Sequence, residues 1–214
     1  VDFLEAHPEY PACVHNTLLH YCTGSRPDEE LVQRGGDCDV EFEDILPGMS
    51  TAWHTSSLLA KTPLLADPPD FYYIAAEYGF GDYPYGIWLR HNGPVRFIAR
   101  TMSAYRICSN DSSWSSGVEG RYDKLVRFMT GAIAMLEAYR AHVTDPDMLR
   151  LVDDNILKWK FQLLYTQGKD KELRRPPYNK LLKAKPLRFR INNAVKCLCP
   201  PLHRLYRRMQ GYDE

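Results

Sequence analysis

Residues 80–107, FGDYPYGIWLRHNGPVRFIARTMSAYRI, carry the pattern that decides the fold. We expect a helix over residues 84–90, because Pro84 suits a first helical turn and Asp82 falls at or next to the N-cap. The HNGP segment at 91–94 is typical of a turn, and the alternation in VRFIA and MSAYRI predicts two short strands. A helix, a turn and strands thus follow one another within this one short stretch.

The segments before this stretch predict further strands and helices. Residues 11–21, PACVHNTLLHY, have the apolar, β-prone centre of a strand, and we expect a loop over residues 23–39. Residues 42–59 predict a short helix, a turn at Pro-Gly, a buried strand and a helix start capped by Ser56 or Ser57.

Helical spacing dominates the second half of the chain. Apolar residues at helical intervals predict long helices over 121–143 and 144–168. The segment RRPPYNKLL, residues 174–182, is interpreted as a linker, and two short basic helices divided by Pro200 and Pro201 are expected after it. The expected parts are an α/β domain over 1–118, a helical pair over 119–170 and a basic helical tail over 171–214.

The charge distribution is uneven although the formal net charge of the 214 residues is zero. Residues 158–208 contain fifteen Lys or Arg and only two acids, whereas residues 1–157 contain twelve basic and twenty-three acidic residues, a net of −11. A basic tail behind an acidic body predicts contact with an anionic surface, unless its charges are simply solvated. No apolar run approaches the eighteen residues of a membrane span.

The six cysteines show no disulfide framework. We therefore expect them to be reduced, as is usual in the cytoplasm. Cys197, Cys199 and His203 lack a second pair of ligands, which argues against a zinc site.

Asp82 is the strongest candidate for chemistry in the sequence. A carboxylate at the start of a helix is stabilised as the anion by free backbone N–H groups and by the helix dipole. Two interpretations are open: a plain N-cap, or a general base held ionised and aimed into a cleft. Gly81 permits close approach of the backbone and Tyr83 can form a pocket wall, which favours the second.

A polar loop follows the predicted strands. Residues 109–117, SNDSSWSSG, have Trp114 at their centre, and such a loop either closes over a ligand or is a surface loop pinned by one buried Trp. Tyr105 and Arg106 precede it. An Arg at this strand end either binds a phosphate or is solvated.

Three segments together resemble a known family. The first is VDFLEAHPEYPACVHN at residues 1–16, and the second is MSTAWHTSSLL at residues 49–59. The third is GDYPYGIWLRHNGPVRFIARTMSAYRI at residues 81–107, which is followed by SSWS at residues 112–115. In residue order and spacing they resemble the second half of a bacterial family-2 glycosyltransferase, over Val1 to about Ser116. The helices and the basic tail after this point do not identify the family.

The resemblance implies a GT-A fold, which is a Rossmann-like α/β domain that binds a nucleotide-sugar. We therefore expect part of an α/β mixed sheet with flanking helices, the acceptor-side half of that domain, followed by a C-terminal helical extension. It also implies an inverting hexosyltransferase that passes a sugar from a nucleotide-sugar donor to a hydroxyl of a carbohydrate or lipid-linked acceptor, in cell-surface polysaccharide or glycolipid assembly. Asp82 matches the family's catalytic base. The expected substrate-binding residues are Ser50, Thr51, Gly81, Tyr83, Tyr105, Arg106 and Trp114.

The family's divalent metal, Mg²⁺ or Mn²⁺, is held by an Asp-x-Asp motif that lies just before the helix opening this chain. We therefore expect no metal ligands within the chain. Because the chain begins at Val1 inside a predicted helix, we also expect a C-terminal fragment, which is inactive alone since the nucleotide and metal ligands would precede it. From the cysteines and the basic tail we expect a cytoplasmic protein, either free or peripheral on the inner face of the membrane.

Two departures from the family pattern concern the site. Many relatives have His where this chain has Cys108, so a His contact to metal or diphosphate is not supported. Relatives often carry Phe-Arg where this chain has Trp53-His54, which either alters acceptor binding or is packing.

Two other functions compete with catalysis. The first is a non-catalytic, transferase-like scaffold whose tail attaches to an anionic membrane surface or a partner. The second is nucleic-acid binding through the tail, and we do not expect it because the chain lacks the motifs of such proteins.

Overall fold

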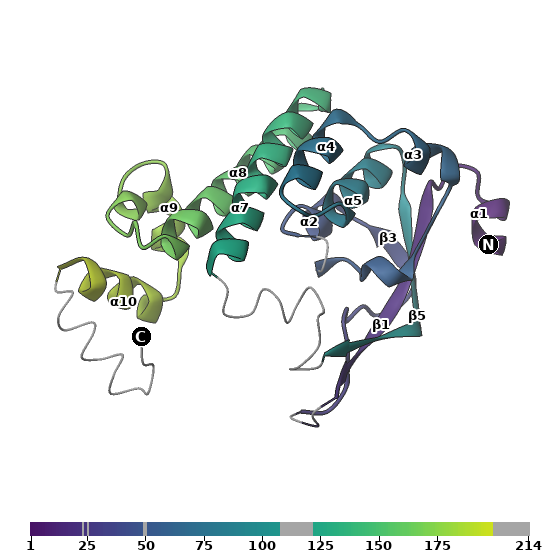
Figure 1. Ribbon diagram of the computed structural model, residues 1–214, viewed down its shortest axis with the longest axis horizontal. Coiled ribbons are helices and arrows are strands. Elements are labelled where there is room, and N and C mark those ends of the chain that lie inside the picture. The colour runs from purple at the N-terminus through teal and green to yellow at the C-terminus, as the bar shows by residue number, and fades with distance from the viewer. Residues whose placement is uncertain (23, 25, 49–50, 108–121, 199–214) are drawn as a thin grey trace. The chain divides into compact units, whose positions relative to one another are not determined.

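The computed structural model describes residues 1–22, 24, 26–48, 51–107 and 122–198 (Figure 1). The chain divides into two compact units, Val1–Asn155 and Ile156–Glu214. This division falls inside a helix rather than at residue 118 or 170. The structure is α/β, with a mixed sheet and flanking helices, as the sequence predicts.

The sheet is built around two long parallel strands, β1 (Ala12–Tyr21) and β5 (Val95–Ile107), which lie side by side in Figure 1. β1 also pairs antiparallel with β2 (Glu29–Glu30) and β4 (Leu58–Ala60). β5 pairs antiparallel with β3 (Cys38–Val40). The strand order is β2-β1-β5-β3, with β4 beside β1, so β1 has the buried character of a central strand.

β5 is one continuous strand where the sequence predicted two. Its parallel partners shift from His15 opposite Ile98 to Asn16 opposite Thr101, so β5 carries extra residues at a bulge. A bulge interrupts the alternation of apolar and polar residues and bends the strand without ending it. The interrupted alternation explains why the sequence suggested a break.

Residues 23–39 were expected to be a loop, and this is wrong where β2 and the start of β3 lie. Strands of two and three residues are too short to show any periodicity in sequence. A side chain also holds β3 against β5, because Asp37 Oδ1 accepts a hydrogen bond from the Ala99 N–H at 2.8 Å.

The predicted buried strand after Pro47-Gly48 is not found among the described residues 51–57. A 3₁₀ helix, η2 (Thr55–Ser57), leads directly into β4 instead. Its N-cap is His54, whose side chain accepts from the Ser56 N–H, so neither Ser56 nor Ser57 is the cap. A ring nitrogen has replaced the expected hydroxyl as the capping acceptor.

The helices of the first unit include α4, α5 and α7, which lie beside one another (Figure 1). Their packed faces bury Phe71, Ile87, Leu136 and Tyr139 completely. The α7 helix confirms the first of the two long predicted helices. The helices described in this unit, before the one that crosses the division, are α1 (Asp2–Ala6), α2 (Phe42–Ile45), α3 (Thr62–Ala66), α4 (Asp70–Glu77), α5 (Asp82–His91), α7 (Tyr122–Tyr139) and the 3₁₀ helix η3 (Arg140–His142).

The close approach of α7 to the turn between α4 and α5 depends on a glycine. A Cβ on Gly131 would lie 2.5 Å from side-chain atoms of Tyr78 and 2.8 Å from Phe80. The Phe80 ring also packs edge-on against Phe128, with 4.9 Å between centroids. Phe80 stands two residues before Asp82, so this contact holds the segment that enters α5.

The second unit contains the end of α8 (Pro146–Thr166), η4 (Glu172–Arg174), α9 (Tyr178–Ala184) and α10 (Leu187–Leu198). Phe161, Leu173 and Leu182 form its core, and Phe189 packs against them. α8 confirms the second long predicted helix. Gly168, with φ of 70°, follows its last turn as predicted and donates its N–H to the Tyr165 carbonyl at 3.1 Å.

The interpretation of residues 174–182 as a linker is wrong over the α9 helix. Pro176 and Pro177 lie just before this helix, where a proline costs no intrahelical hydrogen bond, and Leu182 anchors it in the core. α10 confirms the first predicted basic helix, and the second lies outside the described residues.

Within the described ranges, no helix is both long enough and apolar enough to cross a membrane. Cys13, Cys38 and Cys197 are free thiols, whereas Cys22 is in a disulfide. The expectation that every cysteine is reduced is therefore wrong for Cys22.

Candidate functional site

Asp82 is the first residue of α5, directly after the N-cap Gly81, in agreement with the predicted position. Its side chain is exposed, and its Oδ1 accepts a hydrogen bond from the Tyr83 N–H at 2.8 Å. This position places the negative charge at the positive end of the helix dipole. Pro84 lies in the same first turn, where its missing N–H costs nothing.

A second donor orients the Asp82 carboxylate from a distant segment. The Thr55 hydroxyl donates to Asp82 Oδ2 at 3.0 Å. Each carboxylate oxygen therefore accepts one identified hydrogen bond, and each keeps lone-pair capacity for a ligand. The carboxylate is held by two donors on its protein side while its exposed side remains open.

His54 stands next to this pair and is half-buried. Its Nδ1 accepts from the Ser56 N–H at 3.2 Å, which places the proton of the neutral ring on Nε2. Burial lowers the pKa of His54, and the negative charge of Asp82 opposes that shift. The ring also packs against Tyr105, with 4.5 Å between centroids.

A row of hydroxyl groups continues the polar surface onto the sheet. Ser56 Oγ lies 3.5 Å from Ser103 Oγ, and Ser103 Oγ lies 2.9 Å from Thr17 Oγ1. Thr17 and Ser103 are direct register partners in the parallel β1–β5 pair, after the bulge. The register set by that bulge thus brings the two hydroxyls face to face.

These contacts join η2, α5, β1 and β5 into one polar surface. We call it the Asp82 patch, and it consists of Thr17, His54, Thr55, Ser56, Asp82, Ser103 and Tyr105. Thr17 is fully buried and supports Ser103 from beneath. The patch offers one anionic oxygen pair, one neutral imidazole and several hydroxyls, a set suited to hydroxyl-rich ligands and to proton transfer.

The structure brings only some of the predicted binding residues to the Asp82 patch. Tyr105 belongs to it, and Gly81 borders it as the N-cap of α5. A Cβ on Gly81 would stand 3.1 Å from the Tyr72 hydroxyl, so the glycine admits that ring. Arg106 is exposed at the end of β5, and its side chain makes no hydrogen bond to the part of the chain that the structure describes.

Other predicted binding residues lie elsewhere. Tyr83 is 2% exposed and its hydroxyl donates to the Leu46 carbonyl, which places it in the core. Thr51 donates to the Gly48 carbonyl at 2.8 Å and also to the Asp44 carbonyl, so its hydroxyl closes a turn. Ser50 and Trp114, and also Cys108, lie outside the described residues.

The Trp53-His54 pair resolves into two separate roles. Trp53 is fully buried and packs in the core, and its indole N–H has no partner in the described ranges. His54 points instead to the Asp82 patch. The packing alternative is therefore confirmed for Trp53, whereas an effect of His54 on acceptor binding stays a prediction.

Four residues of the Asp82 patch were not predicted to belong to a binding site: Thr17, Thr55, Ser56 and Ser103. The run His-Thr-Ser-Ser at 54–57 was a usable signal, because such a polar cluster beside a buried Trp is typical of a shaped surface turn. Thr17 and Ser103 carry no local signal, since their pairing depends on a register shift in the sheet.

Asp37, Cys38 and Asp39 have the spacing of an Asp-x-Asp motif, which the sequence analysis overlooked. Both carboxylates have structural partners: Asp37 accepts from the Ala99 N–H, and Asp39 pairs with Arg96 at 3.2 Å. In the described ranges, no three His, Cys, Asp or Glu side chains gather closely enough to hold a metal ion. Cys199 and His203, considered for zinc, lie outside those ranges.

No protein-family model matches this chain, and neither a curated protein nor a solved structure matches it. The geometry of the Asp82 patch and the sequence pattern around Asp82 are therefore the features that point to a function.

Proposed function

We propose that this chain forms the acceptor side of an inverting glycosyltransferase of GT-A type, with Asp82 as the general base. The observation that carries the proposal is the double anchoring of Asp82 by Thr55 and the Tyr83 N–H, beside a row of hydroxyls. An aspartate that only stabilises a helix start needs no donor outside its own first turn. The additional donor from η2 fixes the direction in which the open lone pairs point.

In the proposed reaction, an acceptor hydroxyl oxygen attacks the anomeric carbon of the donor sugar. The bond between that carbon and the diphosphate oxygen breaks, and the nucleoside diphosphate leaves with the electron pair. The acceptor proton passes to a free lone pair of the Asp82 carboxylate. Attack from the face opposite the leaving group inverts the anomeric configuration.

The other residues of the Asp82 patch have supporting roles in this proposal. Ser103 supplies a hydroxyl that exchanges hydrogen bonds with an acceptor sugar, and the fully buried Thr17 orients it from below. Neutral His54, with its proton on Nε2, donates to an acceptor oxygen and does not compete with Asp82 as a cation. The described residues offer no cluster for the family's divalent metal, so no step is assigned to a metal.

The test compares Asp82→Asn with Asp70→Asn in the natural protein that contains these 214 residues. Asp70 is a matched control because it is also the first residue of a helix and also accepts from the next backbone N–H, at 2.7 Å. It pairs with His142, away from the Asp82 patch. Asn still accepts a hydrogen bond at the helix start, so both variants should fold.

We expect Asp82→Asn to lower sugar transfer from nucleotide-sugar donors by about a hundredfold or more, the usual scale for loss of a general base. Binding of the donor, measured by calorimetry, should remain nearly unchanged. Asp70→Asn should transfer at close to the wild-type rate. Transfer by Asp82→Asn within threefold of wild type would mean that Asp82 only stabilises the start of its helix.

A non-catalytic, carbohydrate-binding role is the alternative that the same hydroxyl row supports. It requires that glycans bind to the Asp82 patch while no donor sugar is transferred under any condition. The same experiment separates the two functions. In a binding module, substitution of Asp82 would lower the affinity for glycans, and there would be no transfer rate to change.

A further inference from the structure

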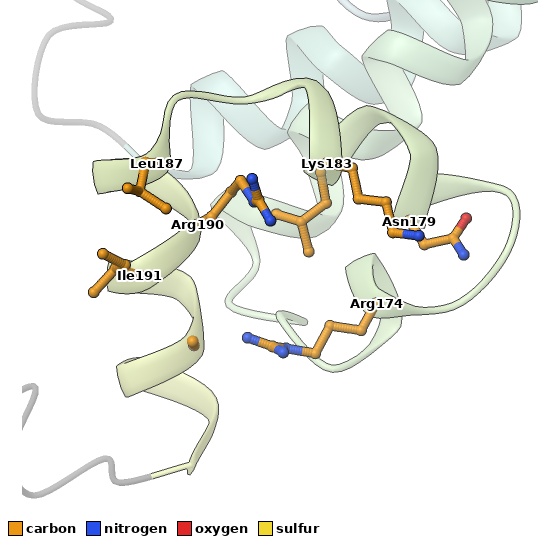
Figure 2. Close-up of a pocket in the computed structure, with 8 residues that line it drawn as sticks. Arg174, Asn179, Lys183, Leu187, Arg190 and Ile191 are labelled. Atoms are coloured by element: carbon orange, nitrogen blue, oxygen red, sulfur yellow. The ribbon is translucent and has the colours of Figure 1, made fainter.

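A pocket of about 530 Å³ lies in the second unit, between α9 and α10 (Figure 2). None of its lining residues is acidic, and three of them are cations: Arg174, Lys183 and Arg190. Figure 2 shows Arg190 extending from α10 toward α9, while Arg174 extends toward α10 from the η4 side. The two guanidinium groups therefore approach the same space from opposite walls.

The cations of this pocket are not neutralised by acids. Among the described residues, no carboxylate lies within ion-pair distance of Lys183 or Arg190. Asp170, a buried acid of this unit, forms an ion pair with Lys196 at 2.7 Å. Residues 174–198 contain eight Lys or Arg and no acid, so no local charge balances the pocket.

Arg174 is held in place by a buried polar network. Its guanidinium donates to Asn193 Oδ1 at 3.4 Å, and Asn193 Nδ2 donates to Asp170 Oδ1 at 2.7 Å. Asn193 is 1% exposed and Asp170 is 4% exposed. Because the network uses one N–H of Arg174, the other guanidinium donors stay available to an anion in the pocket.

The pocket also has an apolar rim. Leu187 and Ile191 line it and are 65% and 54% exposed. They lie four residues apart on α10, and Leu198, 82% exposed, continues the same stripe seven residues later. A helix with an exposed apolar stripe among basic residues has the pattern of helices that lie in a membrane interface.

We propose that this pocket binds the phosphate of an anionic phospholipid, with Arg174, Lys183 and Arg190 around the phosphate and Leu187 and Ile191 against the acyl chain. Charge complementarity selects the anion, and the apolar rim selects an amphiphile over a soluble phosphate. No aromatic side chain lines the pocket, which disfavours single-stranded nucleic acid, since such sites stack bases on aromatic rings. The inference is independent of the transferase proposal.

The test measures binding of the whole chain to phosphatidylcholine vesicles with and without phosphatidylglycerol, by co-sedimentation. The pocket variant replaces Arg174, Lys183 and Arg190 by Gln. We expect wild type to bind only the anionic vesicles, and the pocket variant to bind them on the order of a hundredfold more weakly, since each basic residue at such a surface contributes about a factor of five.

The matched control replaces Arg175, Lys180 and Arg188 by Gln. These residues belong to the same segment and carry the same total charge, but they do not line the pocket. The control should bind anionic vesicles within about fivefold of wild type. Equal losses in the two variants would show diffuse attraction to the surface and would overturn the pocket. All six side chains are exposed, so equal unfolding midpoints should confirm intact folds.

A third variant tests the lipid chain. Leu187→Ser with Ile191→Ser keeps every charge, and we expect about tenfold weaker binding to anionic vesicles. Wild-type affinity in this variant would exclude a role for the acyl chain. Saturable binding of glycerol phosphate without vesicles, lost in the pocket variant, would identify a soluble phosphate ester and overturn the lipid. Binding of a single-stranded oligonucleotide that depends on the same three cations would also overturn it.

Discussion

Replacing Gly131 by Ala tests whether α7 holds the segment that presents Asp82. The added Cβ would lie 2.5 Å from the Cβ and Cγ of Tyr78 and 2.8 Å from Cε1 of Phe80. Real Cβ atoms do not approach other heavy atoms so closely, so a helix or the turn must move. The Tyr78 Cβ cannot swing away by a rotamer change, because it is attached directly to the backbone.

Two opposing effects set the size of the change. Ala is favoured over Gly inside a helix by about 1 kcal/mol. Overpacking a filled core costs about 1–3 kcal/mol. We expect a cost near the upper end of this range, because the added Cβ would clash with two neighbouring side chains. We therefore expect a net loss of roughly 2 kcal/mol in the free energy of unfolding.

Urea denaturation followed by circular dichroism measures this loss. The control is Gly36→Ala, where an added Cβ meets no atom within 4 Å and the backbone has no positive φ, so stability should be unchanged or slightly raised. If Gly131→Ala stabilises the protein by the amount that helix propensity alone gives, the close packing of α7 against the Tyr78–Phe80 turn is refuted.

Three further predictions concern single polar groups. Asp170→Ala should lower the free energy of unfolding by about 2–4 kcal/mol in urea denaturation, because it leaves the buried Asn193 amide without its acceptor; an effect below about 0.5 kcal/mol would argue against that network. His54→Asn keeps an acceptor for the Ser56 N–H but removes the imidazole. Burial lowers the pKa of His54 below the ordinary 6.5, so as the pH falls the unfolded state of wild type binds a proton before the folded state does. Wild type should thus lose stability relative to His54→Asn as the pH falls below about 6.5, and parallel pH curves would exclude the shift. Thr55→Val should leave stability nearly unchanged and slow sugar transfer by about fivefold, since Asp82 loses one orienting donor; an unchanged rate would remove Thr55 from the site.

The sequence predicted correctly those helix ends and helices that a short local pattern specifies. The start of α5 was predictable because Gly81, Asp82 and Pro84 together define a helix entry. The two long helices and the end of α8 at Gly168 followed from apolar spacing and a terminating glycine. Each of these signals spans only a few residues.

The rest of the site depends on contacts between distant residues. Thr55 reaches Asp82 across 27 positions, and Thr17 reaches Ser103 across 86. The second contact also requires the bulge in β5, which sets the register of the parallel pair and which sequence alternation presented as a break. No local pattern specifies such a pairing, so the candidate base was predictable and its surroundings were not.

The central claim is that the Asp82 carboxylate accepts a proton during sugar transfer, and the pH dependence of the transfer rate tests it most directly. In wild type the rate should fall toward acid pH as the base becomes protonated, forming an acid limb. In Asp82→Asn the residual rate should be low and should no longer show that limb, while Asp70→Asn keeps the wild-type profile. An Asp82→Asn variant with an acid limb of the same shape and a rate near wild type would contradict the claim, because another group would then be the base.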